Sequence, residues 1–206
     1  MAFLARGTWH WVAAPLVAGA LLVLYGRNVG VPVALGVALL LLGLLFLQFF
    51  RDPERPAAEG VACPADGVVT AIERRAAGEL FVSIFMNVYN VHVNRAPLAG
   101  RVASRVHKPG SHVPAFRKDS ERNERVEWAF ETEHGLVRVT QIAGLLARRI
   151  VPYAVEGQRV EKGARIGIIR LASRVDVLLP PGFEAAVELG ESVRAGSTTL
   201  ARRRSP

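Results

Sequence analysis

Apolar residues fill most of the first fifty positions of the chain and give way to alternating patterns afterwards. Residues 9–25 form a run of 17 whose only strongly polar member is His10, and residues 31–50 form a run of 20 broken only by Gln48. As a helix, the longer run reaches about 30 Å, the thickness of a hydrocarbon core, and the shorter run lies at the lower limit for spanning. The polar residues 26–30 fit a turn between them. The pattern predicts a membrane-anchoring helical hairpin, with spanning and re-entrant arrangements both open.

From residue 51 onward, short apolar or alternating runs are separated by glycine and proline, which is typical of strands. Residues 133–135 (Glu-His-Gly) lie between two such runs, so residues 126–143 are predicted to form a β-hairpin. The expected strands cover residues 67–72, 80–86, 126–132, 136–143, 165–171 and 175–180.

A second local pattern is a turn bounded by Gly157 and Gly163, with Val160 expected to point inward between them. It resembles the repeated turn of barrel-sandwich domains such as lipoyl carriers. We therefore expect a mostly β (α+β) fold, with a barrel-sandwich-like domain over residues 51–206 preceded by the hydrophobic helical hairpin of residues 1–50.

The charge of the chain is concentrated in the part that follows the apolar runs. The 206 residues include 26 basic and 18 acidic side chains, for a formal charge of +8. Because Arg6 and Arg27 are the only charged residues before position 51, the remainder carries 24 basic and 18 acidic groups, or +6. A helical hairpin would also place Arg6 and the Arg51/Arg55 pair on the same side of the membrane, which the positive-inside tendency makes cytoplasmic. We therefore expect the inner cell membrane, with the basic β domain on the cytoplasmic face beside anionic lipid. No helix-turn-helix, zinc knuckle or aromatic-basic sheet motif supports a nucleic-acid partner.

The sequence offers little to build a metal site or a disulfide. Cys63 is the only cysteine, so an intrachain disulfide and a thiolate-rich metal site are excluded. His107, His112 and His134 have no metal-ligand spacing among them, and we expect no metal.

Three residues in chain order supply a carboxylate, a base and a nucleophile: Asp66, His92 and Ser197. This combination can activate a hydroxyl whose own pKa is too high at neutral pH. Taken singly, each has a structural interpretation as a turn aspartate, a core histidine or a flexible Gly-Ser end. No Gly-x-Ser-x-Gly motif surrounds Ser197. Gly196 before it would instead let the hydroxyl approach the preceding carbonyl, which favours attack on its own peptide bond.

Seven motifs follow one another along the chain: Phe49–Arg55, Pro64–Gly67, Phe85–Arg95, Asn123–Arg125, Gln141–Gly144, Ser173–Asp176 and Gly196–Ser197. Together and in this order, they resemble the short, membrane-bound form of the phosphatidylserine decarboxylase family, and the similarity extends over about the whole chain. Two departures are Cys63, where serine is more usual, and Leu171-Ala172 in place of Phe-Gly.

The resemblance implies a proenzyme that cuts itself between Gly196 and Ser197 into a large chain (1–196) and a small chain (197–206). Asp66 would orient His92, and His92 would deprotonate Ser197. The serine would become a pyruvoyl group, the cofactor, which forms a Schiff base with phosphatidylserine and decarboxylates it to phosphatidylethanolamine in phospholipid biosynthesis.

The resemblance also implies partners: phosphatidylserine in an anionic membrane, and the small chain bound to the large one as a heterodimer that could assemble further. Asn123, Glu124 and Arg125 are candidates for contact with the lipid headgroup, since Arg125 could pair with a phosphate or carboxylate. Two hypotheses from other classes compete: a non-enzymatic membrane adaptor with a barrel-sandwich domain, and a membrane-tethered serine hydrolase.

Overall fold

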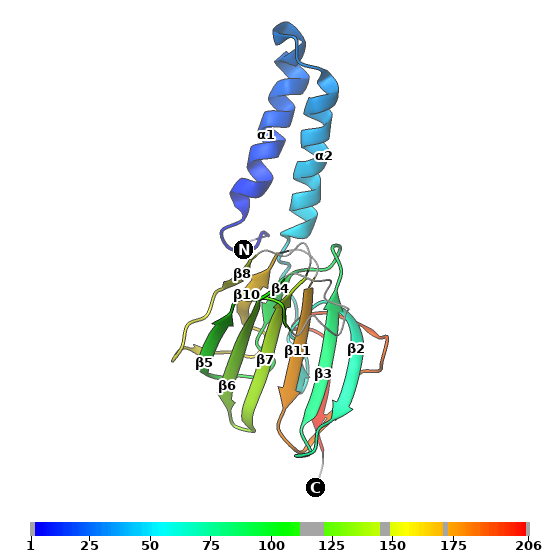
Figure 1. Ribbon diagram of the computed structural model, residues 1–206. Coiled ribbons are helices and arrows are strands. Elements are labelled where there is room, and N and C mark those ends of the chain that lie inside the picture. The colour runs from blue at the N-terminus through cyan, green and yellow to red at the C-terminus, as the bar shows by residue number, and fades with distance from the viewer. Residues whose placement is uncertain (1–2, 112–121, 145–148, 171–172, 205–206) are drawn as a thin grey trace. The chain divides into compact units, whose positions relative to one another are not determined.

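The computed structural model describes residues 3–111, 122–144, 149–170 and 173–204. Within it the chain divides into two compact units, Met1–Glu54 and Arg55–Pro206. The first unit is helical and the second consists of β-sheets (Figure 1). The division falls four residues after the boundary that the sequence predicted.

The first unit is the predicted helical hairpin. Helix α1 (Trp9–Tyr25) is followed by the 3₁₀ turn η1 (Gly26–Val29) and helix α2 (Val33–Phe49), and α1 and α2 run side by side (Figure 1). Helix α2 is three residues shorter than the apolar run because Pro32 caps its start with an extended backbone and Phe50 caps its end. Among the described residues, no helix combines the length and the hydropathy needed to cross a membrane.

Three glycines let the two helices approach closely. A Cβ atom on Gly19 would lie 2.8 Å from the carbonyl oxygen of Gly36, and a Cβ atom on Gly36 would lie 2.9 Å from the carbonyl oxygen of Gly19. A Cβ atom on Gly43 would likewise overlap the side chain of Leu16. Small residues at helix contacts allow backbones to pack directly against each other, which explains why glycines occur in these apolar runs.

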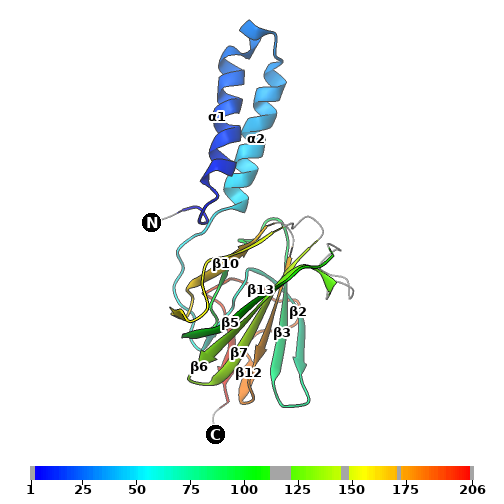
Figure 2. The same cartoon turned by 60° about the vertical axis from the view of Figure 1, so that its left-hand side comes forward.

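The second unit contains one large sheet and two small ones, and all pairs between its described strands are antiparallel. Strands β6, β7, β11 and β3 run side by side in one layer in both views (Figures 1 and 2). The large sheet has the order β13 (Ser192–Val193), β2 (Gly67–Arg74), β3 (Leu80–Met86), β11 (Ser173–Leu179), β7 (Gly135–Ala143), β6 (Arg125–Thr132), β5 (Gly100–Lys108) and β9 (Arg159–Val160). The small sheets have the orders β1 (Val61–Ala62), β14 (Thr199–Arg203), β12 (Phe183–Ala185), and β4 (Val93–Arg95), β10 (Arg165–Ile169), β8 (Ile150–Pro152).

The mostly β class and the predicted hairpin are confirmed. Strands β6 and β7 pair from Arg125 opposite Ile142 to Thr132 opposite Gly135, and Gly135 has a φ of 105°. Gly157 and Gly163 also have positive φ, and Val160 between them is buried. The glycine-bounded turn is therefore present as predicted.

One apolar core joins the three sheets. Buried residues alternate with partly exposed ones along β6 and β11, as expected for strands with one face on a core. The core includes side chains from β1, β14, β10 and the large sheet. Residues from the most distant parts of the second unit therefore meet in one interior.

A chain of buried polar side chains crosses this interior. The indole Nε1 of Trp128 donates to Oε1 of Gln141 at 2.7 Å, and Nε2 of Gln141 donates to Oδ1 of Asn94 at 2.7 Å. Because buried polar groups are costly without partners, these bonds fix β4 against the large sheet. Strand β4 follows directly after His92, so the same bonds constrain the segment that carries this histidine.

Candidate active site

The Gly196-Ser197 pair lies in a turn between β13 and β14. The backbone N–H of Gly196 donates to the carbonyl oxygen of Cys63 at 2.8 Å, and the N–H of Cys63 donates to the carbonyl oxygen of Thr198 at 2.9 Å. Gly196 has a φ of 80°, in the left-handed region that favours glycine. Cys63 therefore holds the turn on both sides of the Gly196–Ser197 peptide bond.

The carbonyl group of Gly196 faces a backbone donor. The N–H of Ala58 donates to the oxygen of Gly196 at 2.8 Å. A donor in this position stabilises negative charge that develops on the oxygen when a nucleophile attacks the carbonyl carbon. Ser197, a partly exposed residue, directly follows this carbonyl and carries the hydroxyl.

Asp66 is buried, with 5% of its surface exposed, and lies directly before β2. Its carboxylate accepts hydrogen bonds from both terminal nitrogens of Arg55, Nη1 to Oδ1 and Nη2 to Oδ2, the latter at 2.9 Å. It also accepts from the N–H of Ala195 at 2.8 Å and, more weakly, from the N–H of Val91 at 3.4 Å. Asp66 thus connects the residue before Gly196 with the residue before His92.

Arg55 joins this candidate site in the structure, although it was not among the residues predicted for it. Besides its two bonds to Asp66, its Nη1 donates to the carbonyl oxygen of Ala195 at 3.0 Å. The Arg55–Asp66 pair therefore binds both the N–H and the C=O of Ala195. Arg55 stands in the Phe49–Arg55 motif, and a buried aspartate requires a nearby cation, so the signal was present in the sequence.

The imidazole of His92 is fully buried. Its Nδ1 lies 2.9 Å from the carbonyl oxygen of Asn90. Since a carbonyl only accepts hydrogen bonds, Nδ1 carries the proton in the neutral ring, which leaves the lone pair on Nε2. Among the described contacts, Asp66 is joined to the segment around His92 through the backbone N–H of Val91. That Asp66 orients His92 stays a prediction.

The Asn123-Glu124-Arg125 segment is placed by bonds within the protein. Nδ2 of the buried Asn123 donates to the carbonyl oxygen of Ala143 at 2.7 Å, and Oε1 of Glu124 lies 3.0 Å from Nε2 of His107. Nε of Arg125 donates to Oε1 of Glu127 at 2.9 Å. Residues 112–121, which precede this segment in the chain, lie outside the described residues. The side-chain amide of Asn123 therefore binds within the protein. Contact between this segment and a lipid headgroup stays a prediction.

Cys63 contributes through its backbone rather than its thiol. Burial raises the pKa of this thiol to about 12, and its Sγ lies 3.1 Å from the carbonyl oxygen of Ala65. The thiol is therefore neutral near pH 7 and unsuited to act as a nucleophile. Among the described residues, no three His, Cys, Asp or Glu side chains form a cluster that could hold a metal ion.

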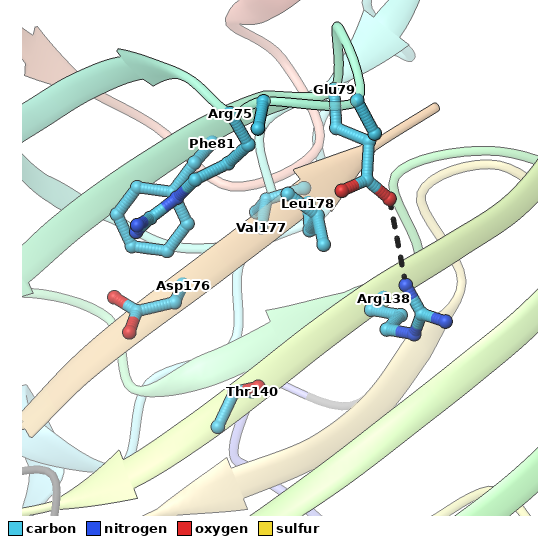
Figure 3. A pocket seen from close by; sticks show the side chains of 10 residues that line it. Arg75, Glu79, Phe81, Arg138, Thr140, Asp176, Val177 and Leu178 are labelled. Atoms are coloured by element: carbon cyan, nitrogen blue, oxygen red, sulfur yellow. Dashed lines mark ion pairs between the residues drawn. The ribbon is translucent and has the colours of Figure 1, made fainter. Parts of the chain in front are cut away.

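A pocket of about 600 Å³ lies on the face of the large sheet that is turned away from the core (Figure 3). Arg138 forms an ion pair with Glu79 at 3.6 Å there, and the guanidinium of Arg75 lies 4.5 Å from the ring centroid of Phe81. None of the predicted site residues lines this pocket. The candidate site is therefore the buried cluster around Gly196, and not this open hollow.

Known proteins with similar sequences are named as phosphatidylserine or archaetidylserine decarboxylase proenzymes. The family model of phosphatidylserine decarboxylase matches residues 42–201. The phosphatidylserine decarboxylase proenzymes of Thermobifida fusca and Streptomyces griseus are 51% and 50% identical, over 97% of this chain and 92% and 93% of their own lengths. The putative archaetidylserine decarboxylase proenzyme of Halobacterium salinarum is 48% identical over 97% of this chain and all of its own length. With most of its length matched by the family model and half of its residues identical to full-length relatives, the chain belongs to the phosphatidylserine decarboxylase family.

Proposed function

We propose that this chain is a phosphatidylserine decarboxylase proenzyme that cleaves itself between Gly196 and Ser197. The observation that carries the proposal is the turn at Gly196, whose carbonyl oxygen accepts a hydrogen bond from Ala58 while the next residue supplies a hydroxyl. The names of its relatives support the same reaction.

In the proposed first step, Oγ of Ser197 attacks the carbonyl carbon of Gly196. His92 takes the hydroxyl proton on Nε2, the ring nitrogen that carries the lone pair. The N–H of Ala58 stabilises the charge on the oxygen of Gly196. Cleavage of the C–N bond then gives an ester between Gly196 and the Ser197 side chain, with a free amine on residue 197.

Asp66 and Arg55 act as positioning residues in this proposal. They bind both polar groups of Ala195, so the peptide that precedes Gly196 cannot rotate freely. A displacement of about 1 Å between reacting atoms can cost a hundredfold in rate, so fixing this backbone favours the attack.

Elimination of the ester would leave a dehydroalanine residue, whose imine tautomer adds water and releases ammonia to give a pyruvoyl group at the start of the small chain. That group supplies a ketone that condenses with the amine of the substrate and withdraws electrons as carbon dioxide leaves. His92 would return a proton to the substrate α-carbon.

The position of β14 supports a cofactor made from Ser197. This strand begins two residues later and lies between β1 and β12, with Leu200 and Ala201 fully buried. Its backbone bonds and buried side chains would keep the small chain bound to the large one after the cut. The two chains would then form one heterodimer, with residue 197 held beside the turn.

Association with membranes is typical of this family. We assign that role in this chain to the helical hairpin, because its large apolar side chains are exposed, among them Trp9, Leu24 and Tyr25 at 60–69%. Exposed apolar surface of this extent is characteristic of contact with lipid or with another protein. Together with the charge of +6 on residues 51–206, it favours an anionic inner membrane with the β unit on the cytoplasmic face.

The proposed substrate is phosphatidylserine. Relatives named for phosphatidylserine and for archaetidylserine are similarly close in sequence, so we infer that the shared serine headgroup is what the site recognises. Arg125, beside Asn123 and Glu124, is the proposed contact for a headgroup phosphate or carboxylate.

The decisive experiment is the intact mass of the purified full-length protein and of its Ser197→Ala variant. We expect the wild type to give chains of residues 1–196 and 197–206, the latter starting with a pyruvoyl group, and the variant to stay uncut. Ser192→Ala, which changes an exposed serine on β13, is the matched control and should be cut normally.

Activity is measured as labelled carbon dioxide from carboxyl-labelled phosphatidylserine in vesicles. Decarboxylation by wild type and Ser192→Ala, but not by Ser197→Ala, is the expected result. A wild type that stays uncut and reacts with a fluorophosphonate probe would instead indicate a serine hydrolase. An uncut, inactive and unreactive wild type would indicate an adaptor.

A further inference from the structure

We infer that the fold contains a preformed receptor for the carboxylate that self-cleavage creates at Gly196. The receptor consists of the backbone N–H of Ala58 and the guanidinium of Arg95. The inference rests on the proposed cut between Gly196 and Ser197, and it assigns these two groups a role in the step that follows ester formation.

The step in question is the elimination of the ester. A base removes the α-proton of residue 197, and the bond between its Cβ and the ester oxygen breaks. The electron pair of that bond stays on the oxygen, which leaves as the carboxylate of Gly196, and a Cα=Cβ double bond remains in residue 197. The new carboxylate is the leaving group, so a group that stabilises its charge accelerates the step.

Ala58 already contacts the atom that will carry this charge. Its N–H donates to the oxygen of Gly196 at 2.8 Å in the uncut chain. The same oxygen belongs to the amide, the ester and finally the carboxylate. One donor can therefore serve each of these states without a movement of the backbone, and its bond becomes charge-assisted at the end.

Arg95 brings a cation to the same residue. Its exposed fraction is 6%, and its Nη1 donates to the carbonyl oxygen of Gly163 at 3.2 Å, which holds the side chain in place. A Cβ atom built on Gly196 would lie 2.9 Å from Cδ, 3.5 Å from Nε and 3.7 Å from Nη1 of Arg95. The side chain of Arg95, from Cδ into the guanidinium, thus occupies the space that a Cβ atom at position 196 would need, an approach that glycine permits.

Arg55 also reaches this turn, but its role differs. Both of its terminal nitrogens bind the carboxylate of Asp66, and its contact is with Ala195 rather than with Gly196. Arg95, whose side chain lies against Gly196, is therefore the cation that we assign to the carboxylate of Gly196.

The test follows the full-length chain after cell-free synthesis in the presence of phosphatidylglycerol vesicles. Samples are taken over time and treated with or without hydroxylamine, and the intact masses of the chains are measured by mass spectrometry. Hydroxylamine converts an accumulated ester into a large chain with a hydroxamate on Gly196 and a small chain that begins with an unmodified Ser197. Ester formation and elimination are thereby measured separately.

We expect Arg95→Met to form the ester but to eliminate about ten- to a hundredfold more slowly, the usual effect of losing one hydrogen bond to a charged group. Hydroxylamine-sensitive chain should then accumulate. Arg95→Lys, which keeps the charge, should recover much of the rate. Arg105→Met is the matched control, because Arg105 also donates to a backbone carbonyl, that of Ala154 at 3.2 Å, outside the turn at Gly196.

Elimination at the wild-type rate in Arg95→Met overturns the inference. So does a folded variant that stops before the ester, since that result indicates a purely structural role. If Arg95→Met does not fold, the rates of ester formation and elimination are measured in Arg95→Gln and judged by the same criteria. A wild type that is never cut between Gly196 and Ser197 refutes the proposed function itself, whereas normal cutting in all variants refutes only the receptor.

Discussion

The Arg55–Asp66 pair should behave as a coupled buried unit, so its two charges cannot be removed independently. The side chains of Arg55 and Asp66 are 13% and 8% exposed, and two bonds join them. Two unit charges about 4 Å apart attract by about 4 kcal/mol at an effective dielectric constant of about 20. Asp66→Asn leaves the guanidinium of Arg55 without its counter-charge, and Arg55→Met leaves the carboxylate of Asp66 with only backbone donors.

Each single substitution should lower the free energy of unfolding by about 3–5 kcal/mol, as measured when one partner of a buried ion pair is removed. For a unit of this size that corresponds to a fall in melting temperature of roughly 6–20 °C. The loss of free energy of unfolding in the double variant should be smaller, by at least about 2 kcal/mol, than the sum of the two single losses, because neither uncompensated charge remains.

The assay is thermal unfolding of the full chain in detergent, with all variants made in the Ser197→Ala background so that every protein is uncut. The exposed pair Arg101–Glu131, whose atoms lie 3.7 Å apart, is the control and should show a coupling below about 1 kcal/mol. Additive effects of Arg55→Met and Asp66→Asn, within about 0.5 kcal/mol, would refute the reasoning.

Three further predictions concern the turn, the thiol and the core. Gly196→Ala should slow self-cleavage at least about tenfold in an intact-mass time course, because φ is 80° and its Cβ atom would lie 2.9 Å from Cδ of Arg95. Normal cutting would contradict this. Burial raises the pKa of the Cys63 thiol from 9.0 to about 12, so iodoacetamide at pH 8 should label the thiol only after unfolding. The stability that the buried neutral thiol contributes should be present below pH 9 and lost between pH 9 and 12. Labelling of the folded protein would refute this. Gln141→Leu should lower the free energy of unfolding by about 2–5 kcal/mol in denaturant titrations, because the indole of Trp128 and a second buried amide lose their partner; an unchanged midpoint would contradict it.

The local patterns of the sequence predicted both helices and the strands β2, β3, β6, β7, β10 and β11, whereas β5 and β14, among others, were not predicted. Helix α1 and strand β3 have the bounds predicted from their apolar runs, and the β6–β7 hairpin turns where Gly135 was expected to allow it. These features depend on periodicity and on residues a few positions apart, which the chain displays directly. Both the start and the end of α2 differ from its apolar run, because caps, and not hydrophobicity, decide where a helix begins and ends.

The sequence by itself thus determined the order of elements, the family resemblance and the candidates Asp66, His92 and Ser197. Only the tertiary structure decided how they meet. The N–H of Ala195 reaches Asp66 across 129 positions of the chain, and Arg55 reaches the carbonyl of Ala195 across 140. Such contacts form because folding buries charges and peptide groups that must then find partners, wherever in the chain those partners lie. The donor from Ala58 to Gly196 is a backbone group, which every residue except proline possesses, so no side-chain pattern could have identified it.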